Sequence, residues 1–157
     1  MLYLFKKKLM KKIILPLILL IMSCSSNSGD KDFTQVNEQE ILDYISENNL
    51  VAQKSTSGLY YIINETGSGE QPIATSNVTV AYKGYYTNGT VFDQNAQGIS
   101  FNLNGVIAGW TEGITYFKEG GSGVLLVPSR LAYGSSNNRG IPGGSVLIFD
   151  VELISVN

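Results

Sequence analysis

The chain has 157 residues, enough for one domain with a short extension, and a formal net charge of −2. It contains no histidine, which excludes nucleophilic machinery built on Ser-His or Cys-His pairs and zinc sites built on imidazole ligands. Its acidic residues show no EF-hand spacing, although a site made only of carboxylates stays open. Hydrolase chemistry is therefore not expected, and we predict neither a metal nor a cofactor.

Residues 1–23 have the composition of a secretory signal peptide, which is basic, then apolar, then small. The apolar run 13–22 is shorter than the roughly 20 residues that a spanning helix needs, and Met10 offers a second start. Cys24 is the only cysteine, and its surroundings resemble the lipobox of bacterial lipoproteins. We predict a lipid anchor at Cys24 that holds the chain at a membrane. The alternative is a plain signal peptide followed by a chance cysteine.

The part of the chain after the signal peptide is acidic. Removal of residues 1–23 takes away five lysines and no acid, which leaves six basic and 13 acidic side chains and a net charge of −7. Nucleic-acid binding depends on neutralisation of phosphates by Lys and Arg, so we predict no nucleic-acid partner. The anchor predicts a place in the cell envelope, on the periplasmic or the outer-membrane face.

Residues 24–56 are predicted to form a polar tether followed by one short helix. The segment 37–40 resembles a capping box, and Ile41 and Ile45 follow on one helical face that ends near 48–49. This helix could pack on the domain that follows or act as a spacer.

Residues 57–157 are predicted to form one domain. Aromatic, β-branched or alternating segments predict strands at 58–64, 78–83, 99–103, 123–127 and 146–154. The Asn88-Gly89 pair predicts a hairpin turn. Apolar residues every three or four positions predict a helix over 106–117. The result is an α+β domain, in which an antiparallel sheet of five to six strands curves around one short helix.

The aromatic residues of this domain lie in a fixed order with fixed neighbours. Judged singly, each is more often a core residue than a site residue. The motifs run in this order: Val80-x-Tyr82-x-Gly84, Gly89-Thr90-x-Phe92-Asp93, Phe101-x-Leu103, Val106-Ile107-x-Gly109-Trp110-x-Glu112-Gly113, Pro128-x-x-Leu131-Ala132-Tyr133-Gly134, Ile141-Pro142 and Leu147-x-Phe149-Asp150-Val151-Glu152-Leu153. As a set they resemble the FKBP-type peptidyl-prolyl cis-trans isomerases, over about residues 57–156.

The resemblance implies a pocket for a proline ring with Trp110 as its floor. It implies that the Ile107 backbone N–H and the Tyr133 hydroxyl each bind a substrate carbonyl, and that Asp93 is the polar residue near the substrate amide. The implied catalytic residues are Tyr82, Phe92, Asp93, Ile107, Trp110 and Tyr133, and the implied substrate-binding residues are Phe101, Val106, Ile141 and Phe149.

The sequence departs from the family pattern in two places. No basic residue lies in segment 94–100 to pair with Asp93, and the pocket-covering loop 134–140 lacks the histidine often found there. The partner of Asp93 is therefore open.

Rotation about an X–Pro amide crosses a barrier of about 18–20 kcal/mol without covalent change, so it needs no acid, base or cofactor. The resemblance therefore implies a prolyl isomerase of the bacterial lipoprotein form, of the gliding-motility-associated type, that assists folding of exported proteins. Its expected partners are proline-containing exported polypeptides. One alternative is a non-catalytic proline-peptide binding or assembly module of an envelope or gliding-motility complex. Another is a structural surface lipoprotein.

Overall fold

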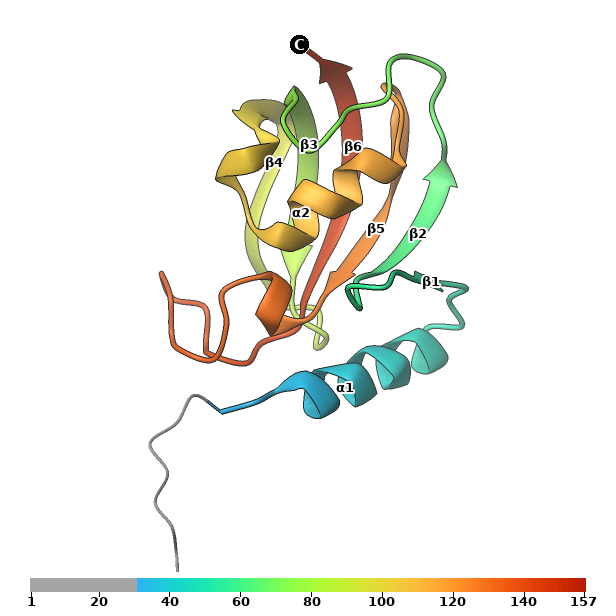
Figure 1. The fold of residues 1–157 in the computed structure, drawn as a ribbon. Coiled ribbons are helices and arrows are strands. Elements are labelled where there is room, and N and C mark those ends of the chain that lie inside the picture. Colours follow the sequence, from blue (N-terminus) through green and yellow to red (C-terminus); the bar gives the residue numbers. More distant parts are fainter. Residues whose placement is uncertain (1–30) are drawn as a thin grey trace, which may run out of the picture.

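The computed structural model describes residues 31–157 (Figure 1). The predicted signal peptide and Cys24 lie outside the described residues. The helices and strands are α1 Thr34–Glu47, β1 Gln53–Lys54, β2 Tyr60–Glu65, β3 Asn77–Tyr85, β4 Val91–Asn102, α2 Ala108–Gly113, β5 Gly121–Val127 and β6 Leu147–Val156. Short 3-10 turns occur at η1 Leu103–Gly105, η2 Ile114–Tyr116 and η3 Ser129–Leu131. Within 31–157, no helix combines the length and the apolar character that crossing a membrane requires.

The strands form one six-stranded antiparallel sheet in the order β1-β2-β5-β6-β3-β4. Helix α2 lies across one face of this sheet (Figure 1). The predicted α+β arrangement, an antiparallel sheet around one short helix, is confirmed. The pairing of β3 with β6 sets Tyr82 opposite Val151 and Gly84 opposite Phe149, which brings residues far apart in the sequence to one place on the sheet.

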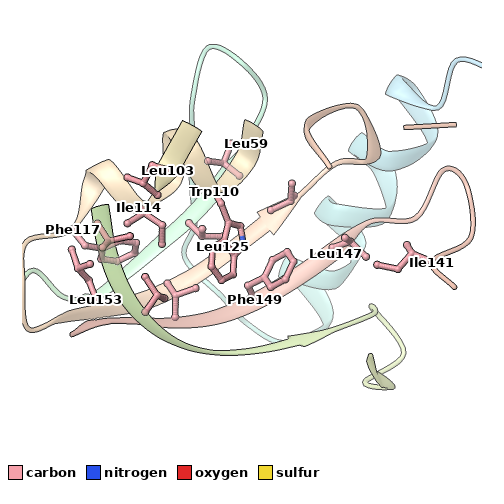
Figure 2. Close-up of a cluster of buried hydrophobic side chains, with 14 residues drawn as sticks. Leu59, Leu103, Trp110, Ile114, Phe117, Leu125, Ile141, Leu147, Phe149 and Leu153 are labelled. Carbon is pink, nitrogen blue, oxygen red and sulfur yellow. The ribbon is translucent and has the colours of Figure 1, made fainter. Parts of the chain in front are cut away.

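The main core fills the space between α2 and the sheet. Figure 2 shows Trp110 reaching from α2 toward Phe149 on β6, with Ile114 and Phe117 farther along the same side of the sheet. Inward-facing residues alternate along the strands as a half-buried sheet requires. For example, Leu147, Phe149, Val151 and Leu153 of β6 all belong to this cluster.

The predicted helix over 106–117 is wrong in extent. The α-helix covers only Ala108–Gly113 and continues as the 3-10 turn Ile114–Tyr116. Ile107 is extended, with φ −61° and ψ 146°, and its carbonyl accepts hydrogen bonds from the N–H groups of the first helical turn. Adjacent β-branched side chains at Val106 and Ile107 favour this extended backbone.

The predicted capping box at 37–40 is also wrong, because α1 begins at Thr34. Asn37 is an interior residue of the helix and only 1% exposed. Its Nδ2 donates to the Gly144 carbonyl at 2.8 Å, and its Oδ1 accepts from the Ser129 N–H at 2.8 Å. The buried Asn37 amide thus satisfies two backbone groups of another segment and has both of its own polar atoms paired.

Helix α1 packs on the sheet face opposite α2. Ile41, which is fully buried, forms a second cluster with Tyr60 of β2, Leu126 of β5 and Ile148 of β6. Of the two possibilities left open by the sequence, packing on the domain is the one observed.

Strand β4 is longer than the predicted 99–103. It begins at Val91, directly after the hairpin turn at Asn88-Gly89, and pairs with β3 through two register shifts. Its polar residues 93–95 have low strand propensity, and their backbone pairing with β3 maintains this part of the strand.

Candidate active site

A cavity of about 640 Å³ opens beside α2, between strands β3 and β4 and the loop that follows η3. It is mainly lined by aromatic and aliphatic side chains, as in small-ligand pockets generally. The lining residues are Tyr82, Phe92, Asp93, Ile99, Phe101, Gly105, Val106, Ile107, Ala108, Trp110, Ala132, Tyr133, Asn138, Arg139 and Phe149.

Nine of the ten residues that the resemblance assigns to the pocket line this cavity, and Ile141 does not. Ile141 is 9% exposed and belongs to the main core cluster. The Asn138–Ile141 backbone pair closes the tip of the loop, so Ile141 turns inward while Asn138 and Arg139 reach the cavity.

A larger groove of about 790 Å³ lies elsewhere, between α1 and the turn that joins β3 to β4. Its lining is mostly polar or acidic, including Glu40, Asp43 and Glu47. It offers no aromatic enclosure for a ring, so the cavity beside α2 is the better candidate for the active site.

Trp110 forms the floor of the cavity and is 6% exposed. Its ring lies 5.1 Å from that of Tyr82 and 5.2 Å from that of Phe149, both nearly perpendicular to it. The Phe101 ring lies 5.5 Å away, and Phe92 meets Phe149 edge-on at 5.6 Å. Edge-to-face packing stabilises such clusters beyond the area they bury, so the walls are held in place before a substrate binds.

Asp93 has a partner in the structure, which the sequence had left open. The Tyr82 hydroxyl donates to Asp93 Oδ2 at 2.7 Å. Burial, followed by this hydrogen bond, raises the pKa of Tyr82 to about 12. Tyr82 therefore remains a neutral donor throughout the physiological range, and Asp93 fixes the direction of its hydroxyl.

The buried Nε1–H of Trp110, on the cavity floor, has no hydrogen-bond partner within residues 31–157. Two further donors on residues of the predicted site are also without a partner in this part of the chain. They are the backbone N–H of Ile107, which lies at the extended residue before α2, and the hydroxyl of Tyr133, on the loop after η3. Unpaired donors in an apolar cavity suit ligand carbonyl oxygens, which would otherwise lose their hydrogen bonds on leaving water.

The sequence missed six residues of the lining. Ala108 and Gly105 adjoin predicted site residues, and Ala132 precedes Tyr133. Ile99 lies in a predicted strand, where nothing distinguishes a rim residue from a surface one. Asn138 and Arg139 belong to the loop that was predicted to cover the pocket, and the basic character of Arg139 was the available signal.

The comparisons agree with this geometry. The family model described as FKBP-type peptidyl-prolyl cis-trans isomerase matches residues 68–154. The chain belongs to this family. It is 46% identical over 105 residues to the FKBP-type peptidyl-prolyl cis-trans isomerase FkpA of Escherichia coli strain K12, a match covering 65% of this chain and 39% of the relative. It is 40% identical over 133 residues to FkpA of Aeromonas hydrophila, covering 82% of this chain and 49% of the relative. The chain thus spans less than half the length of the FkpA relatives it matches.

Solved structures show the same fold. The crystal structure of FkpA from Escherichia coli aligns with a TM-score of 0.71 and 40% identity, over 78% of this chain and 60% of that one. The peptidyl-prolyl cis-trans isomerase of Pseudomonas syringae pv. tomato aligns with a TM-score of 0.69 and 28% identity, over 82% of this chain and 99% of that one. The second alignment spans almost the whole of a solved isomerase, so this chain contains the full extent of that fold.

Proposed function

We propose that this protein is a peptidyl-prolyl cis-trans isomerase that acts on proline-containing segments of exported polypeptides and assists their folding. One observation carries the proposal. The aromatic cavity on Trp110 carries the Ile107 N–H and the Tyr133 hydroxyl on its lining, and neither has a hydrogen-bond partner within residues 31–157. A proline ring fits the aromatic part, and the carbonyls on either side of it fit the donors.

Binding of the proline ring and acceleration of the amide rotation depend on different interactions. Burial of a proline ring on Trp110 stabilises the planar and the twisted amide equally, so it lowers KM without raising the rate of rotation. A planar amide is more dipolar than a twisted one, and a dry apolar cavity therefore disfavours the ground state relative to the transition state. Donors that bind the twisted carbonyl better contribute the rest. A million-fold acceleration requires roughly 8 kcal/mol in total.

The test is isomerisation of a short proline peptide by the purified protein carrying Cys24→Ser, which keeps it free of a lipid anchor. We expect acceleration over the spontaneous rate, and its loss in Trp110→Leu. Rates equal to the uncatalysed ones for a folded protein would exclude the enzyme.

The same cavity supports a second function, a non-catalytic module that holds proline-containing partners in an envelope or gliding-motility complex. Saturable binding of the peptide without acceleration would favour this alternative. A structural surface lipoprotein, the third possibility, requires that Trp110→Leu leave cellular function intact.

We further propose that Cys24 is lipidated and anchors the protein in the cell envelope, as in the gliding-motility-associated lipoproteins. The support is the sequence of residues 1–24, with its lysines, short apolar run and terminal cysteine. Cys24→Ser is expected to move the protein from the membrane fraction to the soluble fraction, and an unchanged distribution would contradict lipidation.

A further inference from the structure

The rim of the cavity carries one charged side chain, Arg139, that the proposed chemistry does not use. Of the residues lining the cavity, Arg139 is the single cation and Asp93 the single anion. Asp93 accepts the Tyr82 hydroxyl. Arg139 is exposed, and within residues 31–157 its guanidinium makes no hydrogen bond, ion pair or ring contact. By contrast, Arg130 donates to the Ser57 carbonyl.

Backbone geometry fixes the position of Arg139. Asn138 and Ile141 exchange two backbone hydrogen bonds, of 3.0 and 2.8 Å, which leaves Arg139 and Gly140 as the two residues of the turn between them. Their φ angles are 48° and 87°. Positive φ at both central residues defines a type I′ turn.

Arg139 is an unusual residue for this turn. The first position of a type I′ turn favours Asn, Asp or Gly, because other side chains are strained in the left-handed region. Strained residues of this kind concentrate at functional sites. An arginine with free hydrogen-bond donors, held in this conformation on a cavity rim, points to a ligand group of negative charge.

We propose that Arg139 makes the cavity select proline segments with an Asp or Glu residue directly next to the proline. This inference rests on the proposed isomerase function. The planar guanidinium binds a carboxylate through two parallel hydrogen bonds. Arg139 lines the same cavity as Trp110, and adjacent residues lie only about 3.8 Å apart along the chain. A side chain beside a proline seated on Trp110 therefore comes within reach of the guanidinium.

The net negative charge of the protein restricts the preference for acidic residues to positions next to the proline. The part of the chain after the signal peptide carries a net charge of −7, so acidic segments are repelled by most of its surface. Arg139 places the single positive charge of the lining on the cavity rim, where it attracts a carboxylate within the roughly 8–10 Å over which charges act at physiological salt. Selection is thus local to residues that adjoin the proline.

The experiment compares matched peptides that carry Glu, Gln or Lys beside the proline, in one series before it and in a second series after it. The protein carrying Cys24→Ser is expected to show a kcat/KM for Glu about two- to fivefold above that for Gln in at least one series, as suits an exposed ion pair. This ratio is expected to fall to one in Arg139→Gln, and to shrink as NaCl is raised. Lys118→Gln is the matched control, because it removes the same charge from an exposed side chain that does not line the cavity.

The variant Arg139→Asn distinguishes loss of the positive charge from loss of stability. Asparagine suits the left-handed turn position, so this variant is expected to melt at the same or a higher temperature while losing the Glu preference. Equal rates for Glu and Gln in both series, a preference for Lys, or a ratio retained in Arg139→Gln would each overturn the inference. Absence of acceleration for every peptide would instead contradict the proposed isomerase function.

Discussion

Tyr82 and Tyr133 both line the cavity, but within residues 31–157 only Tyr82 has a partner for its hydroxyl. Asp93 holds the Tyr82 hydroxyl in one direction, so Tyr82 serves as a wall with a fixed polar edge. The Tyr133 hydroxyl is left for a ligand. Two residues of the same type therefore have different roles, and their hydrogen bonds distinguish them.

Tyr133→Phe removes this free donor and leaves the ring. We expect kcat/KM for a proline peptide to fall about three- to tenfold, the value of one hydrogen bond to a neutral acceptor. Tyr61→Phe is the matched control, because Tyr61 stacks on Tyr116 and lies outside the cavity. The two variants should show identical circular dichroism. Equal activity in Tyr133→Phe and Tyr61→Phe would exclude the hydroxyl from the reaction.

At this scale the sequence predicted most of the cavity. The resemblance identified Trp110 and the aromatic walls because their spacing is fixed by the strands and by α2. It misplaced Ile141 because the direction of a loop residue depends on the Asn138–Ile141 pairing, which no periodicity reveals. It missed Arg139 although its basic character was an available signal, because an exposed arginine in a loop is ordinarily a solvated surface residue.

At the scale of elements, Asn37 couples α1 to the loop that covers the cavity. Its amide binds the Ser129 N–H at one end of this loop and the Gly144 carbonyl at the other. Tyr133 and Arg139 both lie between these two points. Helix α1 thus defines where the loop starts and ends, although none of its residues lines the cavity.

Asn37→Ala removes both hydrogen bonds and leaves two buried backbone groups without partners. We expect the free energy of unfolding in urea to fall by about 2 kcal/mol or more, and KM to rise as the loop loosens. Gln35→Ala, on the exposed side of α1, should change stability by less than about 0.5 kcal/mol. A loss of stability with unchanged KM would show that Asn37 supports the fold but not the loop.

Gly84 on β3 has no side chain, which leaves space for the aromatic rings that form the cavity walls. A Cβ at this position would lie 2.7 Å from Phe92 Cζ and 3.0 Å from Phe149 Cε1. Gly84→Ala is therefore expected to displace these rings, to lower the free energy of unfolding by about 1–3 kcal/mol, and to raise KM. In a Phe92→Leu background the same alanine should cost less, because the contacting ring is gone. Equal costs in the two backgrounds, measured by urea unfolding, would contradict this packing.

The sequence predicted the elements where side-chain pattern and burial agree. The alternation along β3 and β6 was visible because one face is buried. The true start of α1 was not visible, because Asn37 has the composition of a cap but a tertiary partner 107 residues away. The start of β4 was hidden in the same way, since its polar residues are held by pairing with β3 and not by their own propensity.

At the scale of the whole molecule, the sheet order explains why the site is built from distant segments. Strand β6 lies between β5 and β3 although it comes last in the chain. This position brings Phe149 next to Gly84 and beneath Trp110. The residue patterns predicted the fold class and the order of the motifs indicated the family, but only the pairing of β3 with β6 explains how these distant residues meet at the cavity.

The absence of histidine leads to a prediction about pH. Burial, followed by the hydrogen bond to Asp93, raises the pKa of Tyr82 to about 12, and burial with Glu112 does the same for Tyr116. A tyrosine whose folded pKa lies above its unfolded value of about 10 stabilises the fold below pH 10, and this contribution is lost as pH rises through 12. On the acid side, the hydrogen bond from Lys54 lowers the pKa of Glu38, whose contribution is present above about pH 4.5 and is lost below it.

In the protein carrying Cys24→Ser, no side chain has an ordinary pKa between about 5 and 9. We therefore expect both the free energy of unfolding and kcat/KM to stay level from about pH 5 to 9, and stability to fall steeply above about pH 10. Tyr82→Phe should weaken the alkaline fall without affecting the acid limb. Urea unfolding at each pH checks the predicted stability profile, and peptide isomerisation across the same range checks the predicted kcat/KM profile. A step in activity between pH 6 and 7 would show that a proton moves in the reaction, which the shape of this cavity does not require.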